Sequence, residues 1–277
     1  MFTIRNFHIN TLRAIVGAIL PSRTRLQSDR IYYVRTDGSD SNDGLSDSAG
    51  GAFATIQKAV DEAVVLDGGN NNITIQVGDG TYNEHVNLQW HPNSRPIVLQ
   101  GNTSVVGAVI IQGTSNHTIS CSSGYWRVQH FELRNNSSAY NNVFAQFNCE
   151  LLLGSGMQYG TTGGNHVSSY YGAKVTMLSS YNISGNAVTA IFAAHDGWIY
   201  MAGINCTFVG TRSFSYSFIA LHNGSSIRAT GFTWSGTSPT GVRYRIQENS
   251  VLNTANFSST YFPGSSNGII TTGGLYS

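Results

Sequence analysis

Two different hydrophobic periodicities divide the chain. Between residues 53 and 64, apolar residues recur at the three- and four-residue spacing of one helical face, with charged residues between them. From Ile73 onward, the apolar residues instead form short runs of strand length, separated by Gly, Asn and Ser. The pattern predicts one amphipathic helix followed by many short strands. The apolar helical positions are Ile56, Ala59, Val60, Ala63 and Val64.

The predicted helix lies within residues 31–84, where a strand at Ile31 to Val34 and a loop rich in Gly and Asp precede it. A strand at Ile73 to Val77 follows it. A helix with a single apolar face must cover other apolar side chains. We expect it to cap the first coil of a β structure, where unpaired backbone would otherwise be exposed. Further strands are expected within residues 97–99, 105–111, 126–133 and 143–153.

Three similar tripeptides indicate an internal repeat. Ile183-Ser184-Gly185, Phe208-Val209-Gly210 and Trp234-Ser235-Gly236 recur at spacings of 25 and 26 residues. A unit of this length, with about three short strands, is typical of one coil of a parallel β-helix. A propeller blade needs four strands in about 40 residues, and a sandwich lacks this repeat. Roughly seven coils between residues 73 and 254, about 4.8 Å apart, predict a rod about 35 Å long.

Charge is scarce and unevenly distributed in this chain. Charged residues make up 10% of the 277 residues, against about 25% in a typical protein, and the net charge is +1. A field that would attract nucleic acid or an anionic membrane is therefore not expected. Ten of the 14 carboxylates lie between Asp29 and Glu84. The later ones are Glu132, Glu150, Asp196 and Glu248.

Metal and disulfide chemistry are not indicated, and no cofactor is expected. Cys121, Cys149 and Cys206 are far apart and form no CxxC pair, so we expect buried, free thiols. The acidic loop 37–44 invites a calcium interpretation, but the acidic spacing and the closing Glu of a calcium loop are missing. Turns in which Asp side chains bond to the backbone explain this loop better.

The first thirty residues stand apart from the rest of the chain. They hold five of the 15 basic residues around an apolar run from Ala14 to Leu20, which is short for a signal peptide and far too short to cross a bilayer. We expect this segment to dock on a partner or a sister subunit, with packing on its own domain as the alternative. The expected docking residues are Arg5, Arg13, Ile15, Ile19 and Leu20.

Two groups of motifs resemble a known class of proteins. Residues 32–44, 52–59 and 79–84, the last reading Asp79-Gly80-Thr81-Tyr82-Asn83-Glu84, resemble the opening of pectin-lyase-like right-handed β-helix proteins, which include many phage tailspikes. Residues 241–245, 251–254, 261–265 and 273–277 resemble the closing segment of phage and prophage tail proteins of that class. Together these segments cover about a third of the chain. The class includes polysaccharide-cleaving enzymes and non-catalytic fibres, usually trimeric when viral.

The best catalytic candidates are Glu132 and Glu150, because glycoside hydrolysis needs two nearby carboxylates. Each Glu lies between apolar neighbours, so both are expected to point outward, and their 18-residue separation could stack them one coil apart. The alternative is that they are solvated or pair with Arg127 and Arg134. Asp196, next to His195, is interpreted as a turn residue.

Aromatic residues at alternate positions are candidates for ligand binding. Trp198 and Tyr200 are expected to share one strand face, as are Phe214, Tyr216 and Phe218. We single out Trp198, Tyr200 and Tyr216 as candidates for stacking on sugars. The same rings would also suit a subunit interface or the core.

The sequence thus predicts an all-β, right-handed parallel β-helix with an N-terminal capping helix. Residues 1–30 would form the attachment segment, 31–84 the cap, 85–254 the body and 255–277 the closing segment. With the resemblance, the expected function is a homotrimeric fibre or spike module of a phage or phage-like virion that binds host-surface glycans. The alternatives are a polysaccharide depolymerase and a capsid decoration protein. Neither nucleic-acid binding nor membrane insertion is expected.

Overall fold

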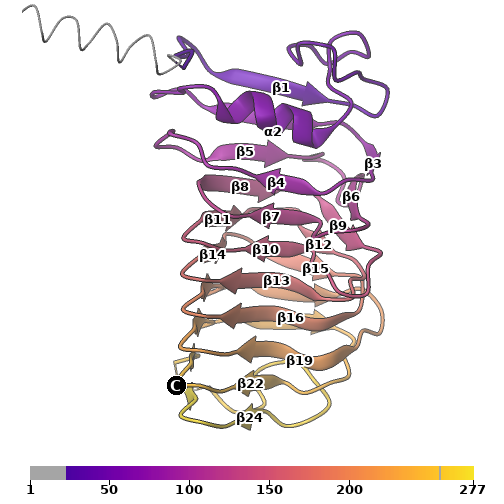
Figure 1. The fold of residues 1–277 in the computed structure, drawn as a ribbon. Coiled ribbons are helices and arrows are strands. Elements are labelled where there is room, and N and C mark those ends of the chain that lie inside the picture. The colour runs from indigo at the N-terminus through magenta and orange to yellow at the C-terminus, as the bar shows by residue number, and fades with distance from the viewer. Residues whose placement is uncertain (1–22, 256) are drawn as a thin grey trace, which may run out of the picture.

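The computed structural model describes residues 23–255 and 257–277, which form a rod of stacked coils (Figure 1). Each complete coil contributes one strand to each of three sheets, and all strand pairs within these sheets are parallel. The fold is therefore a parallel β-helix, as the short strands and the repeat predicted. Seven complete three-strand coils run from Ile73 to Ile246, which confirms the expected number of coils.

The three sheets differ in length because the ends of the rod add strands unequally. The ten-stranded sheet contains β1 (Arg30–Val34), β2 (Ile73–Val77), β5 (Ile97–Gln100), β8 (Tyr125–Gln129), β11 (Glu150–Leu153), β14 (Lys174–Met177), β17 (Trp198–Tyr200), β20 (Ser226–Arg228), β23 (Val251–Asn253) and β25 (Leu275–Tyr276). The seven-stranded sheet contains β3 (Gly80–Tyr82), β6 (Val109–Gly113), β9 (Glu132–Asn135), β12 (Gln158–Tyr159), β15 (Tyr181–Ile183), β18 (Asn205–Phe208) and β21 (Thr233–Gly236). The eight-stranded sheet contains β4 (Val86–Leu88), β7 (Ile119–Cys121), β10 (Val143–Ala145), β13 (Asn165–Tyr170), β16 (Ala187–Ala194), β19 (Phe214–Leu221), β22 (Tyr244–Ile246) and β24 (Ile269–Ile270).

The core consists of inward-facing side chains at equivalent positions of successive coils, stacked along the rod. Because side chains alternate along a strand, one set from each sheet points into the rod. The parallel register then places each inward residue directly over its counterpart in the next coil. In the ten-stranded sheet, one such buried row is Ile97, Trp126, Leu151, Val175, Ile199, Ile227 and Leu252.

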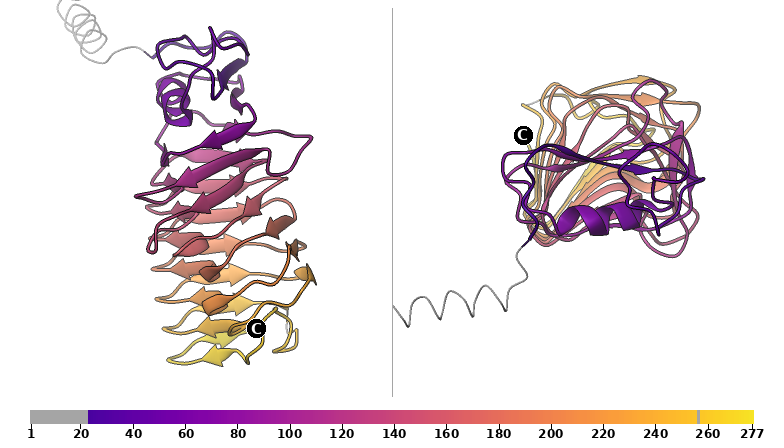
Figure 2. Two further views of the ribbon diagram at one scale, coloured as in Figure 1. Left: turned by 90° about the vertical axis from the view of Figure 1, so that its right-hand side faces the viewer. Right: turned by 90° about the horizontal axis from the view of Figure 1, so that it is seen from above.

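Helix α2 (Ile56–Val64) covers the first coil, as Figures 1 and 2 show. All five apolar residues of its predicted stripe are buried, which confirms the capping role. Thr55 begins the helix by accepting the Lys58 backbone N–H, and the Glu84 carboxylate accepts the N–H groups of Ile56 and Gln57. At nine residues, α2 is the only helix in the described part of the chain, and it is too short to cross a membrane.

Two of the predicted strands are broken by corners. The runs 126–133 and 143–153 each divide into two strands in different sheets, at His130 (φ 63°) and at Phe147 and Asn148 (φ 53° and 60°). These residues lie in the left-handed region, which turns the chain from one sheet to the next. Hydrophobicity continues through the turn because residues on both sides face the core, so the apolar pattern alone does not mark it.

The corner between the eight- and ten-stranded sheets repeats two left-handed residues in successive coils. At the second position, Asn148 and Asp196 alternate with Gly172 and Gly224. The Asn148 side-chain oxygen would lie 2.5 Å from a Cβ at Gly172, and that of Asp196 would lie 2.9 Å from one at Gly224. Glycine is therefore required wherever the polar side chain of the preceding coil lies over the corner.

The internal repeat holds in only one of its two steps. Ile183 pairs with Phe208, as the 25-residue spacing predicted, but Phe208 pairs with Gly236 and Trp234 pairs with Cys206. The coil between them is longer, because it contains an extended loop at residues 209–213 and a β-bulge in β19. Matching tripeptides therefore overestimated the regularity of the coils.

Candidate functional site

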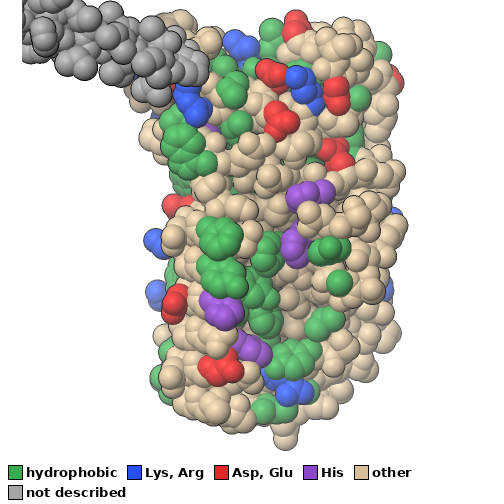
Figure 3. Space-filling view, viewed as in Figure 1, with side chains coloured by type: hydrophobic (Ala, Val, Ile, Leu, Met, Phe, Trp, Pro, Cys, Tyr) green, Lys and Arg blue, Asp and Glu red, His purple; other side chains and the backbone are tan. Residues whose placement is uncertain are grey.

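Aromatic and histidine side chains form a zigzag on the outer face of the eight-stranded sheet. His117 stacks on Phe144, with ring centroids 4.2 Å apart and planes at 9°. The chain of contacts continues through Tyr170 and Phe192 to His222, at centroid distances of 5.2 to 5.4 Å. Figure 3 shows hydrophobic and histidine side chains gathered in columns over this sheet. We call these five residues the aromatic zigzag.

Register explains why the rings interleave rather than collide. The outward row through successive strands alternates large and small residues, so each ring has a small neighbour above and below it. Tyr170 and His222, two residues beyond the small positions Ser168 and Ala220, complete the zigzag between these rings. The row reads Ser120, Phe144, Ser168, Phe192 and Ala220.

A second column, the corner stack, follows the left-handed corner beside the zigzag. Phe147, Tyr171 and His195 occupy the first corner position in three successive coils, and their rings stack at 5.3 and 4.9 Å. Phe147 is 56% exposed and Tyr171 is 47% exposed. Tyr170 lies 6.0 Å from Tyr171 and 6.2 Å from His195, which joins the two columns into one surface, called here the aromatic face.

The ionisable rings of the zigzag are neutral at pH 7. Burial, with a smaller contribution from His85, lowers the pKa of His117 to about 4, and burial also lowers the pKa of His222. Burial raises the pKa of Tyr170 to about 12. The Asn141 backbone N–H donates to His117 Nδ1 at 3.0 Å, which requires this nitrogen to be unprotonated. The zigzag therefore offers uncharged ring surfaces.

Tyr216, one of the predicted binding residues, lies at the end of the aromatic face. Its hydroxyl is 3.2 Å from His222 Nε2, and the Arg245 guanidinium lies 4.4 Å from its ring. The expectation that Phe214, Tyr216 and Phe218 share one face is wrong. A bulge adds one residue to β19, so Phe214 and Phe218 are buried among core rings while Tyr216 is partly exposed.

Trp198 and Tyr200, the other predicted binding residues, lie on the outer face of the ten-stranded sheet. Their rings stack at 5.7 Å, which confirms that they share one strand face. Arg228 in the next coil lies 5.8 Å from the Tyr200 ring. This smaller cluster is separate from the aromatic face, because β17 and the aromatic zigzag belong to different sheets.

The two candidate catalytic carboxylates do not form a pair by stacking. Glu132 is in β9 of the seven-stranded sheet, whereas Glu150 is in β11 of the ten-stranded sheet. The 18-residue separation is shorter than a coil, so the second Glu falls on a different side of the rod. Glu132 instead forms an ion pair with Arg134 at 2.6 Å, which was the alternative interpretation, and it is buried rather than solvated.

Other predictions concern the cysteines, the turn residues and the docking segment. All three cysteines are buried and free. His195 and Asp196 are corner residues, and Asp43 accepts the Leu45 backbone N–H in the acidic loop, as expected for turn residues. Residues 23–255 and 257–277 contain no cluster of three potential metal ligands among His, Cys, Asp and Glu. The docking residues Arg5, Arg13, Ile15, Ile19 and Leu20 lie outside the described residues.

The sequence pattern did not predict most of the aromatic face. Its rings are spread over residues 117–222 and come together only when coils stack. One signal was present: an aromatic or His residue followed by Asn, Gly or Asp recurs every 24 residues at Phe147, Tyr171 and His195. Searches of protein families and of curated proteins found no match for this chain.

Proposed function

We propose that this protein is a non-catalytic β-helix module of a virion fibre or spike and that its aromatic face binds a host-surface polysaccharide. The observation that carries glycan binding is the stacked, partly exposed surface of aromatic and histidine rings on the eight-stranded sheet and the corner beside it. The virion setting and a homotrimeric assembly are supported by two resemblances. Residues 32–44, 52–59 and 79–84 resemble pectin-lyase-like β-helix proteins, which include many phage tailspikes, and residues 241–245, 251–254, 261–265 and 273–277 resemble phage and prophage tail proteins. Attachment through residues 1–30 belongs to the same proposal.

The chemistry of the aromatic face favours sugars over charged partners. Exposed rings can contact the apolar C–H faces of sugars, while tyrosine hydroxyls and imidazole nitrogens can exchange hydrogen bonds with sugar hydroxyls. The chain has a net charge of only +1, so electrostatic attraction to a phosphate backbone would be weak. An exposed apolar surface that runs over several strands is typical of an interaction site.

Binding to purified bacterial capsular and O-antigen polysaccharides tests the proposal. We expect at least one polysaccharide in such a panel to bind the full chain in biolayer interferometry. Tyr171→Asn should then reduce affinity about tenfold or more. Stacking of one base on an aromatic ring contributes on the order of 1–3 kcal/mol in proteins that bind single-stranded nucleic acid, and we expect a similar contribution from stacking of a sugar. Asn is chosen because it tolerates the left-handed backbone at this corner (φ 50°).

Trp198→Ala is the matched control, since it removes a large ring from the other sheet. It should leave affinity for the same polysaccharide unchanged. Equal losses in both variants, or no binding to any member of the panel, would contradict glycan binding by the aromatic face. New reducing ends after incubation with a bound polysaccharide would contradict the non-catalytic part. Immunogold labelling of particles tests the virion setting.

A further inference from the structure

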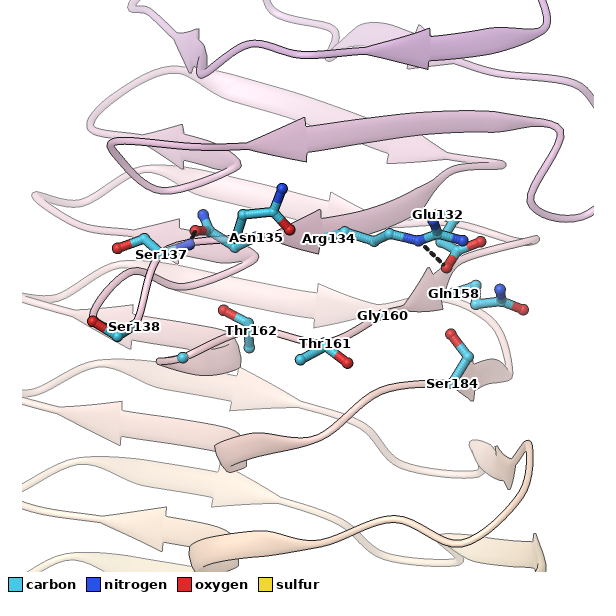
Figure 4. A pocket seen from close by; sticks show the side chains of 12 residues that line it. Glu132, Arg134, Asn135, Ser137, Ser138, Gln158, Gly160, Thr161, Thr162 and Ser184 are labelled. Atoms are coloured by element: carbon cyan, nitrogen blue, oxygen red, sulfur yellow. Dashed lines mark hydrogen bonds and ion pairs between the residues drawn. The ribbon is translucent and has the colours of Figure 1, made fainter.

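A polar groove lies on another side of the rod, beside the corner between the seven- and eight-stranded sheets. It has a volume of about 650 Å³, within the range of about 300–1,000 Å³ typical of small-molecule sites. Glu132, Arg134, Gln158, Thr161 and Ser184 line it (Figure 4). The described residues that line the groove include no aromatic ring, which distinguishes it from the aromatic face.

Glu132 is an unusual residue for this position. It points outward, because its neighbour Leu133 faces the core, yet its side chain is only 6% exposed. A buried carboxylate is unfavourable unless it is paired and hydrogen-bonded. Arg134 Nε donates to Glu132 Oε1 at 2.6 Å, but Oε2 accepts no hydrogen bond from the described residues. One carboxylate oxygen is therefore available to a donor in the groove.

Two glycines leave space beside the carboxylate. A Cβ at Gly107 would lie 3.2 Å from Glu132 Oε2, and one at Gly160 would lie 3.1 Å from Oε1 and 2.6 Å from Arg134 Cγ. A side chain at Gly160 would therefore displace Arg134 and cover the ion pair from the groove side. The lack of side chains at both positions leaves space next to the two carboxylate oxygens.

The donors and acceptors of the groove identify the class of ligand. Glu132 accepts hydrogen bonds, Arg134 donates them, and the amide of Gln158 and the hydroxyls of Thr161 and Ser184 can do both. This combination suits adjacent sugar hydroxyls, each of which donates one bond and accepts others. An anion would meet the carboxylate, and a metal ion would find only one carboxylate among the described lining residues.

The groove is coupled to the aromatic face through the corner loops. Thr162 Oγ1 donates to the Tyr140 carbonyl at 2.6 Å, and the Tyr140 ring contacts the edge of His117 at 5.2 Å. His117 begins the aromatic zigzag. A loop that lines the groove therefore also supports one end of the aromatic face, so the two surfaces flank the same part of the rod.

We propose that this groove is a saccharide subsite in which Glu132 and Arg134 bind the hydroxyls of a single neutral sugar residue edge-on. The inference rests on the proposed glycan-binding function and deepens it, because the groove would select among sugars by hydroxyl configuration. The aromatic face would supply stacking that tolerates many sugars. Specificity and general affinity would then lie on two different faces.

The experiment uses the full chain and a panel of methyl glycosides of glucose, galactose, mannose and rhamnose. We expect at least one glycoside to cause saturable amide shifts at Gly160 and Thr161 in 1H–15N NMR titrations. Glu132→Gln should weaken that binding about tenfold or more, as expected for loss of a charge-assisted hydrogen bond. Glu150→Gln, which changes an exposed carboxylate on the ten-stranded sheet, should bind like the unmodified protein.

Ser184→Ala provides a second variant that alters the rim without disturbing the ion pair, in case Glu132→Gln does not fold. It should weaken binding of the same glycoside. The subsite is refuted if no glycoside shifts the groove amides, or if the folded groove variants bind as well as Glu150→Gln. Polysaccharide binding that depends on Tyr171 but not on the groove refutes the subsite alone. Groove binding of a glycoside without polysaccharide binding refutes the proposed function alone.

Discussion

The outer faces of the eight- and seven-stranded sheets are built on the same coils but have opposite chemistry. The first carries stacked rings from His117 to His222. The second carries short polar side chains, such as Asn205, Thr207 and Ser235, that hydrogen-bond to one another within a strand and across coils. Inward positions are restricted by the shared core, whereas outward positions are free to differ. A β-helix can therefore present different binding chemistry on each side without changing its interior.

The closest approach between the backbones of adjacent coils lies at the edge of the polar outer face of the seven-stranded sheet, called here the polar face. We therefore expect the largest loss of stability from a substitution there. In Gly185→Ala, the new Cβ would lie 2.2 Å from the Gly160 carbonyl carbon and closer still to the Thr161 backbone nitrogen. We expect the free energy of unfolding to fall by about 3 kcal/mol or more, because backbone in the adjacent coil must move. Urea unfolding followed by circular dichroism measures this change.

Gly50→Ala is the control for Gly185→Ala, since no heavy atom lies within 4 Å of a Cβ at that position. Its unfolding midpoint should stay close to that of the unmodified protein. Similar midpoints for both variants would show that the coils can separate at this corner. Close stacking would then not restrict which residue can stand at this position.

The second prediction concerns the contribution of the aromatic zigzag to stability. Tyr170→Ala removes a ring that contacts Phe144 and Phe192 in the adjacent coils. We expect a loss of about 2 kcal/mol, because aromatic pairs add to the effect of burial. Asn182→Ala, at a partly exposed position of β15 on the polar face, should change stability by about 0.5 kcal/mol or less. Equal losses would remove the energetic contrast between the faces.

The third prediction concerns the pH dependence of stability, to which His117 of the aromatic face contributes. The pKa of His117 on the aromatic face is lowered to about 4 and that of His166 inside the rod to about 3, in both cases chiefly by burial. An unfolded His titrates near about 6.5, so the unfolded chain binds more protons below that pH. Stability should be complete above about pH 6.5 and fall progressively as the pH decreases toward 4.

His117→Phe keeps a ring beside Phe144 but cannot be protonated. We expect it to reduce, without abolishing, the loss of stability between about pH 6.5 and 4, because His166 still contributes. Urea midpoints at a series of pH values measure this effect. A pH profile identical to that of the unmodified protein would show that the His117 environment does not disfavour the charged ring.

The smallest effect is expected within the polar face itself. Thr207 Oγ1 lies 3.1 Å from Ser235 Oγ, and both side chains are solvent-exposed enough to bond to water instead. A double-mutant cycle of Thr207→Val and Ser235→Ala should give a coupling energy of about 0.5 kcal/mol or less. A coupling as large as the Tyr170→Ala effect would show that polar ladders stabilise this rod as strongly as stacked rings.

Local sequence patterns were sufficient to predict the helix and the fold class. The stripe from Ile56 to Val64 predicted both the helix and its buried face, because helical neighbours are set by spacing within one segment. Short apolar runs and the approximate repeat predicted seven stacked coils. The strand boundaries at His130 and Phe147 were missed, because corners with buried residues on both sides interrupt the backbone without interrupting hydrophobicity.

The sequence by itself determined which residues are apolar, where the helix forms and that strands recur at coil length. Only the tertiary structure decided which outward residues become neighbours. Coils differ in length, and one added residue reverses alternation, as the bulge beside Tyr216 shows. The separation of Glu132 from Glu150 and the assembly of Phe147, Tyr171 and His195 both follow from the register between coils, which depends on the length of each coil between them.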